Sequence, residues 1–136
     1  MKARFPYKYV GKVYFGEIFR PVAKISFKSP SSELEATVWL IVDSGADFTI
    51  LPKYLALDLG ISLEHDCISD ITKGIGGFQK IFLLKNPIEI KIGKVSKKVP
   101  IAFFDSNELP ALMGRLGFME RFNVEFTRSL SVIFKE

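Results

Sequence analysis

The apolar run Ala36–Ile41 and the turn that follows it constrain the fold of this chain more than any other stretch. The run leads into Val42-Asp43-Ser44-Gly45-Ala46-Asp47, which places a carboxylate on a tight turn at the end of a buried strand. Gly45 has no Cβ, so its backbone can come close to a ligand. Asp-Ser-Gly is also a common turn in which the carboxylate caps its own loop. Asp43 is therefore a candidate site residue with two open interpretations.

The size and composition indicate one globular domain. A chain of 136 residues can bury a real core. Apolar residues make up 48% and charged residues 25%, which excludes a disordered or low-complexity protein. Thirteen Phe residues, with many Ile and Val, favour a β-rich core.

The charge pattern and the cysteine count bear on partners and compartment. The net charge of +4 is spread along the chain without a basic stripe interleaved with aromatics, so no nucleic-acid partner is expected. No segment reaches the roughly 20 apolar residues of a membrane span, and the N-terminus lacks the apolar region of a signal peptide. Cys67 is the one cysteine and cannot form an intrachain disulfide, which favours a reducing compartment, the cytoplasm.

Short extended segments separated by turn residues predict a mainly-β single domain with two short helices. Pro52 and Gly60 bracket the first helix, 52–59, and apolar residues on one face indicate the second, 116–122. Residues 61–72 look polar and irregular, with short extended pieces. Strands are expected at 7–14, 21–27, 36–43, 49–51, 78–84, 88–92, 97–104, 110–113, 124–126 and 130–134.

Three features then follow in one order along the chain: the Asp43-Ser44-Gly45-Ala46 turn, a glycine-rich hairpin around Gly74–Gly77, and Ala111-Leu112-Met113-Gly114-Arg115 before a short helix. In this order they resemble the retropepsin-like aspartic proteases, and most of all their small prokaryotic members. The resemblance covers residues 21–136. It implies a closed, barrel-like acid-protease domain that works as a C2 homodimer. Residues 1–20 match no general feature of the family and are expected to be an N-terminal extension, of unknown role, packed on the domain.

The resemblance implies roles for the residues of the first turn. Asp43 matches the catalytic aspartate, and Ser44 matches the hydroxyl residue that hydrogen-bonds across the dimer axis. Gly45 would offer its backbone to the substrate, and Ala46 is the small residue packed beneath the loop.

The resemblance also implies roles outside that turn. Asp47 matches an acid at the edge of the substrate groove, and Arg115 matches its ion-pair partner; the alternative is two solvated charges that never meet. The flap tip over a bound peptide corresponds to Ile75, Gly76 and Gly77, where the alternative is an ordinary mobile hairpin. Support for the catalytic loop corresponds to Leu112, Met113 and Gly114, where the alternative is a core strand that ends at a glycine.

Peptide hydrolysis by an aspartic protease needs two carboxylates around one water molecule. This chain contains a single Asp-Ser-Gly. The second carboxylate must then come from a second copy through a two-fold axis. The expected function is a homodimeric aspartic endopeptidase that acts on peptide or protein substrates. The alternatives are a non-catalytic dimeric peptide-binding module and a structural β-domain with no site.

Other reactive side chains give only weak support for a metal site or a nucleophilic enzyme. Four adjacent residues, Glu64 to Cys67, cannot all point at one metal ion, so we expect a polar loop, no metal and no cofactor. Ser44 as a nucleophile would need His65, the single histidine, and the turn lacks Gly-x-Ser-x-Gly. With no second histidine to activate it, Cys67 is expected to be inert.

Overall fold

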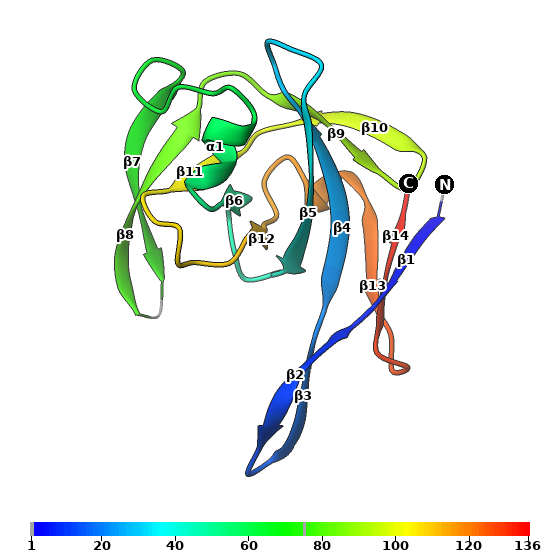
Figure 1. Ribbon diagram of the computed structural model, residues 1–136. Helices are drawn as coiled ribbons and strands as arrows, with labels where there is room; N and C mark the ends of the chain where they lie inside the picture. Colours follow the sequence, from blue (N-terminus) through cyan, green and yellow to red (C-terminus); the bar gives the residue numbers. More distant parts are fainter. Residues whose placement is uncertain (1, 75) are drawn as a thin grey trace.

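Strands account for most of the regular structure in the computed structural model, which describes residues 2–74 and 76–136 (Figure 1). Two short helical segments interrupt them, α1 (Tyr54–Asp58) and the 3-10 helix η1 (Met119–Arg121). The strands are β1 (Lys2–Pro6), β2 (Lys8–Val13), β3 (Gly16–Arg20), β4 (Val22–Lys28), β5 (Glu35–Val42), β6 (Ile50–Leu51), β7 (Cys67–Gly74), β8 (Gly77–Leu84), β9 (Ile88–Ile92), β10 (Val95–Val99), β11 (Ala102–Phe104), β12 (Leu112–Met113), β13 (Asn123–Phe126) and β14 (Ser131–Lys135).

The largest sheet is a curled half-barrel. Its strand order is β10-β9-β4-β5-β12-β6-β11-β8-β7, and smaller sheets contain β1-β14-β13 and β2-β3. The mainly-β prediction is confirmed. Within the described residues, the large sheet runs from one edge at β10 to another at β7, so the chain by itself does not form the closed barrel that we expected.

Alternating side chains build the core on the inner face of this sheet. In β9, Ile88, Ile90 and Ile92 are buried while the residues between them are exposed. In β4, Ile25 and Phe27 are fully buried by the same period of two. This alternation is the signal from which the strands could be predicted.

The short strand β12 lies between two strands that are close together in sequence. It pairs in parallel with β5, where Leu112 lies opposite Ile41, and antiparallel with β6, where Leu112 lies opposite Ile50. Strand β12, from much later in the chain, therefore lies between β5 and β6, the two strands that the Asp43 turn connects. This arrangement positions the candidate site.

Several predicted element boundaries differ from the structure. Residues 61–72 were expected to be irregular with only short extended pieces, whereas the continuous strand β7 begins at Cys67 because it pairs along its whole length with β8. The strand predicted over 97–104 is two strands, β10 and β11, separated by Pro100 and Ile101. The second helix is only the 3-10 turn Met119–Arg121, since the backbone extends again at Phe122.

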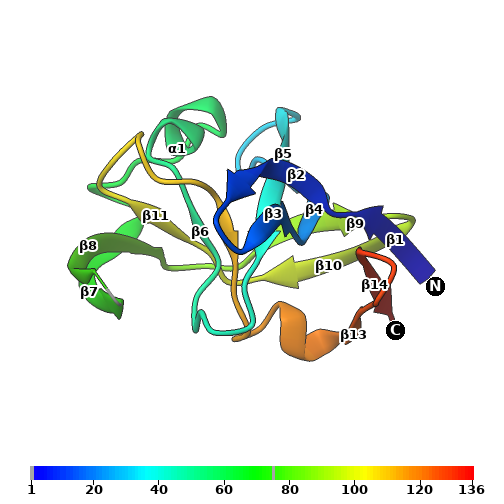
Figure 2. The same cartoon turned by 90° about the horizontal axis from the view of Figure 1, so that it is seen from below.

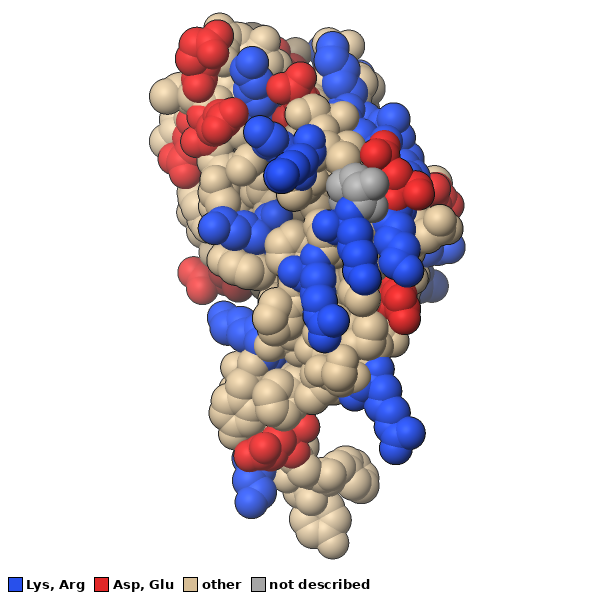
Figure 3. Space-filling view, turned by 90° about the vertical axis from the view of Figure 1, so that its right-hand side faces the viewer, with Lys and Arg blue, Asp and Glu red and all other residues tan. Residues whose placement is uncertain are grey.

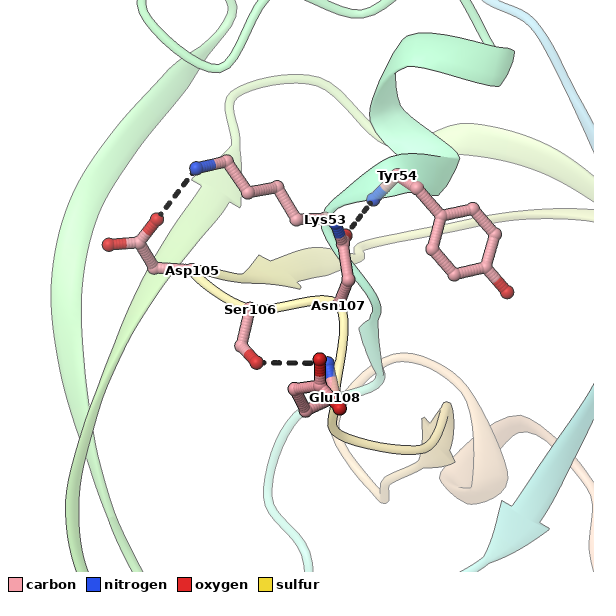
Figure 4. A network of polar contacts seen from close by, with 6 residues as sticks. All are labelled: Lys53, Tyr54, Asp105, Ser106, Asn107 and Glu108. Atoms are coloured by element: carbon pink, nitrogen blue, oxygen red, sulfur yellow. Dashed lines mark hydrogen bonds and ion pairs between the residues drawn. The ribbon is translucent and has the colours of Figure 1, made fainter.

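The first helix is capped from outside its own sequence (Figure 4). Lys53, at its N-cap, makes no side-chain capping bond. Instead Asn107 Oδ1 accepts the Tyr54 N–H at 2.9 Å, and Lys53 Nζ lies 3.1 Å from Asp105 Oδ1. These bonds fasten the connection between β11 and β12 to the helix, and so fix the path that leads into β12.

The N-terminal residues form two different structures. Strand β1 pairs antiparallel with β14, which joins the two ends of the chain. The segment predicted as a strand over 7–14 is β2, and it forms a hairpin with β3, which we did not predict. This hairpin projects from the lower end of the molecule in Figure 1. No helix among the described residues is long and apolar enough to cross a membrane.

Candidate active site

The turn that follows β5 holds Asp43 by its backbone. The Asp43 N–H donates to the carbonyl of Met113 in β12 at 3.0 Å, and the Asp43 carbonyl accepts the Ala46 N–H at 3.1 Å. The carboxylate accepts the Gly45 N–H at 2.9 Å through Oδ1. Asp43 is partly buried, while Ser44 and Gly45 are exposed beside it. The carboxylate is therefore oriented by the turn and still open to solvent or ligand.

The segment that follows β12 packs directly beneath this turn. Gly114 is buried, and a Cβ built on it would lie 2.2 Å from the carbonyl oxygen of Phe48. Only glycine allows the two backbones to approach so closely. The Gly114 N–H donates to the hydroxyl of Thr49 at 3.0 Å, and the Arg115 N–H donates to the carbonyl of Ala46 at 2.9 Å.

Thr49 is a site residue that the sequence interpretation missed. It is buried, and its hydroxyl binds Gly114 across 65 positions of sequence. The available signal was a lone hydroxyl residue between Phe48 and the apolar pair Ile50-Leu51. A buried polar side chain in an apolar strand needs a partner, but the sequence does not say which.

Asp47 and Arg115 lie together at the edge of the turn. Arg115 Nη2 is 2.6 Å from Asp47 Oδ1, and the Asp47 carbonyl accepts the Leu116 N–H at 2.9 Å. Both side chains are about half exposed, so the pair is an oriented surface contact. Asp47 is the other acid of the turn, and its carboxylate is engaged by the guanidinium.

The glycine-rich segment is the end of a long hairpin, as its pattern predicts. Strands β7 and β8 pair from Cys67 and Leu84 to Gly74 and Gly77. Gly76 and Gly77 are exposed, whereas Ile75, the third expected flap residue, lies outside the described residues. In Figure 1 the free end of this hairpin and the turn after β5 both lie on the lower side of the main body, above the projecting β2–β3 hairpin.

The remaining reactive side chains lie elsewhere. Cys67 is buried at the start of β7, and burial, with Asp66 nearby, raises the pKa of its thiol despite the opposing charge of Lys85. The His65 N–H donates to Ser62 in the loop before β7. Within residues 2–74 and 76–136, no group of three or more His, Cys, Asp or Glu residues could hold a metal ion.

The structure thus combines a curled β sheet, the Asp43 turn, the strand β12 beneath that turn and the glycine-rich β7–β8 hairpin. A family model described as aspartyl protease matches residues 33–118, and the chain belongs to this family. The match includes the Asp43 turn, the β7–β8 hairpin and the Gly114-Arg115 segment. A comparison with curated proteins found no match.

Proposed function

We propose that this protein is a homodimeric aspartic endopeptidase in which two Asp43 carboxylates, one from each subunit, activate a water. The observation that carries this proposal is the geometry of Asp43. Its backbone is fixed by Met113 and Ala46, its carboxylate is oriented by the Gly45 N–H, and it remains open beside exposed Ser44.

Two close carboxylates supply the acid and the base that peptide hydrolysis requires. They cannot both ionise at neutral pH, so the pair shares one proton. The ionised carboxylate accepts a proton from water as the water oxygen attacks the scissile carbonyl carbon, and the protonated carboxyl donates to the carbonyl oxygen. Proton transfer to the amide nitrogen then lets the carbon–nitrogen bond break.

A second chain is needed because Asp47, the other acid of the turn, is already engaged. Its carboxylate is paired with Arg115 at 2.6 Å. A two-fold axis beside Asp43 would bring the same turn of a second copy against the first. Ser44 would then hydrogen-bond across the axis, which suits its exposed position.

The substrate we propose is an extended peptide or unfolded protein segment. It would lie between the turn and the β7–β8 hairpin and pair by strand addition, with the Gly45 backbone and the flap residues Gly76 and Gly77 as contacts. Asp47 and Arg115 would form the edge of that groove. Since the one thiol is buried and unpaired, we propose that the enzyme works in the cytoplasm.

The test is hydrolysis of an unstructured peptide library, followed by mass spectrometry, with sedimentation of the same samples. Asp43→Asn should reduce cleavage to background and leave the dimer intact, because the amide keeps the shape but cannot accept the proton. Asp58→Asn on α1 is the matched control, since Asp58 is exposed and lies outside the turn. A statine-type inhibitor should block the wild-type protein.

Two results would contradict the proposal. Unchanged cleavage by Asp43→Asn would remove the carboxylate from the mechanism. Peptide binding without turnover at any pH, unaffected by the same substitution, would instead favour the non-catalytic peptide-binding module.

A further inference from the structure

The β2–β3 hairpin exposes apolar side chains to solvent. Tyr14 and Phe15, at its tip, are each 97% exposed. Tyr9, Val10, Val13 and Phe19 are also exposed along its two strands. Figure 3 shows the hairpin projecting below the body, with a largely uncharged end. We call residues 8–20 the arm.

The arm is a separate two-stranded sheet, and such a hairpin is only marginally stable in water by itself. One cross-strand pair supports it, since Tyr9 lies opposite Phe19 with ring centroids 5.2 Å apart. Exposed aromatics at the tip of a projecting element indicate a surface that is covered by a partner.

Both ends of the arm are hydrogen-bonded to the body of the domain, and one of them lies next to the candidate active site. Before the arm, the Tyr7 N–H donates to the carbonyl of Leu130 at 2.9 Å. After it, the carbonyl of Pro21 accepts the N–H of Val42, the residue before Asp43, also at 2.9 Å. The base of the arm is therefore held beside the catalytic turn, and Figure 2 shows β2 and β3 in front of β4 and β5 when seen from below.

We propose that the arm packs its apolar side chains on a second copy of this chain and holds the two Asp43 turns together. This inference rests on the dimer of the proposed function. A two-fold axis beside Asp43 also lies beside the base of each arm, because Pro21 is hydrogen-bonded to Val42. Strands of five and six residues extend about 20 Å, which is enough to reach across such an axis onto the partner.

The exposed aromatic area of the arm is a large part of what a dimer interface needs. Taking about 200 Å² for a fully exposed aromatic side chain, the four aromatic residues of the arm leave roughly 550 Å² uncovered. A stable interface of ordinary size buries about 800 Å² on each partner. The arm would thus supply about two thirds of that area, and the surface around the Asp43 turn would supply the rest.

The test compares the dimer dissociation constant of the wild type with that of Tyr14→Ser/Phe15→Ser by sedimentation over a wide concentration range. The double substitution should raise the constant at least about 100-fold, because buried aromatic anchors dominate interface energy. Both side chains are almost fully exposed within the chain, so the fold should be retained, which circular dichroism checks.

Leu34→Ser/Leu57→Ser is the matched control. Both residues are exposed and apolar, and they lie in the β4–β5 turn and on α1, away from the arm. This control should change the dissociation constant less than about threefold, within the usual effect of surface substitutions. The arm variant should also cleave peptides normally once its concentration exceeds its own dissociation constant.

The arm proposal would be overturned by a wild type that is monomeric at every concentration, by an arm variant that dimerises like the wild type, or by an equal loss of dimer in both double variants. Vesicles of phosphatidylglycerol test a membrane surface as the other occupant. Vesicle binding that the arm variant loses, with its dimer unchanged, would also overturn the proposal. Because sedimentation measures the dimer without any catalysis, a wild type that is dimeric but inactive would contradict only the proposed function and not the arm proposal.

Discussion

Replacing Gly114 with alanine tests how the strand threaded beneath the catalytic turn is packed. A methyl group at this position would lie 2.2 Å from the oxygen, 2.4 Å from the carbon and 2.8 Å from the nitrogen of Phe48. All three are backbone atoms, so no side-chain rotation can relieve the overlap. The turn or the segment after β12 would have to move.

The size of the effect follows from this geometry. Ordinary carbon–oxygen contacts begin near 3.3 Å, so the overlap is about 1 Å. Overpacking typically costs about 1–3 kcal/mol, and more when backbone must shift. Moving the segment after β12 away from the turn would also weaken two hydrogen bonds, from the Gly114 N–H to Thr49 and from the Arg115 N–H to Ala46. Each contributes about 1 kcal/mol. We expect Gly114→Ala to lower the free energy of unfolding by about 3–5 kcal/mol, a large share of the usual 5–15 kcal/mol.

Urea denaturation at one fixed protein concentration measures this change, since dimerisation makes the apparent stability concentration-dependent. Gly74→Ala is the control, because a Cβ at Gly74 meets no atom within 4 Å. It should shift the free energy of unfolding by less than about 1 kcal/mol. A loss below about 1 kcal/mol for Gly114→Ala would refute the close packing of the turn on the segment after β12.

Three further predictions concern the same site and the buried thiol. Thr49→Val should lower the free energy of unfolding by about 1–3 kcal/mol because the buried Gly114 N–H loses its acceptor; Thr49→Ser, which keeps the hydroxyl, should be the more stable variant. Arg115→Gln should cost less than about 1 kcal/mol in the same urea assay, since its contact with Asp47 is half exposed, and 0.5 M salt should narrow the difference from wild type. A loss above about 2 kcal/mol would contradict a surface role for this pair. Cys67 should react with a thiol reagent at pH 8 at least about tenfold more slowly in the folded chain than in the denatured chain. Because folding raises the pKa of this thiol, its contribution to the free energy of unfolding is complete below about pH 9 and is lost as the pH rises through the folded pKa, a decline that Cys67→Ser should reduce.

Local patterns were enough to predict most strands. The alternation in β9 and the apolar run that ends at Asp43 are properties of neighbouring residues, and they fix which face of each strand is buried. The strands predicted over 124–126 and 130–134 are confirmed as β13 and β14, which pair in an antiparallel hairpin. The Asp43 turn, the glycine-rich hairpin and Gly114 could be located from the sequence because each motif is short and contiguous.

Elements whose stability depends on distant partners could not be predicted. Strand β1 forms because it pairs with β14 at the other end of the chain, and α1 is capped by Asn107, 53 positions after the N–H that it accepts. The arm was missed because its second strand follows the first after only two turn residues that are not typical of a hairpin turn, Tyr14 and Phe15.

The sequence by itself determined the acidic turn, the mainly-β class and the position of the Leu112-Met113-Gly114 segment along the chain. Only the tertiary structure decided that β12 enters between β5 and β6, that Thr49 accepts the Gly114 N–H, and that Arg115 reaches Asp47. The physical reason is that every backbone N–H and C=O group is chemically alike, so hydrogen bonding alone does not select which strands pair. Which strands pair is chosen by burial over the whole sheet, and the side chains near Asp43 are brought together as a result of that choice.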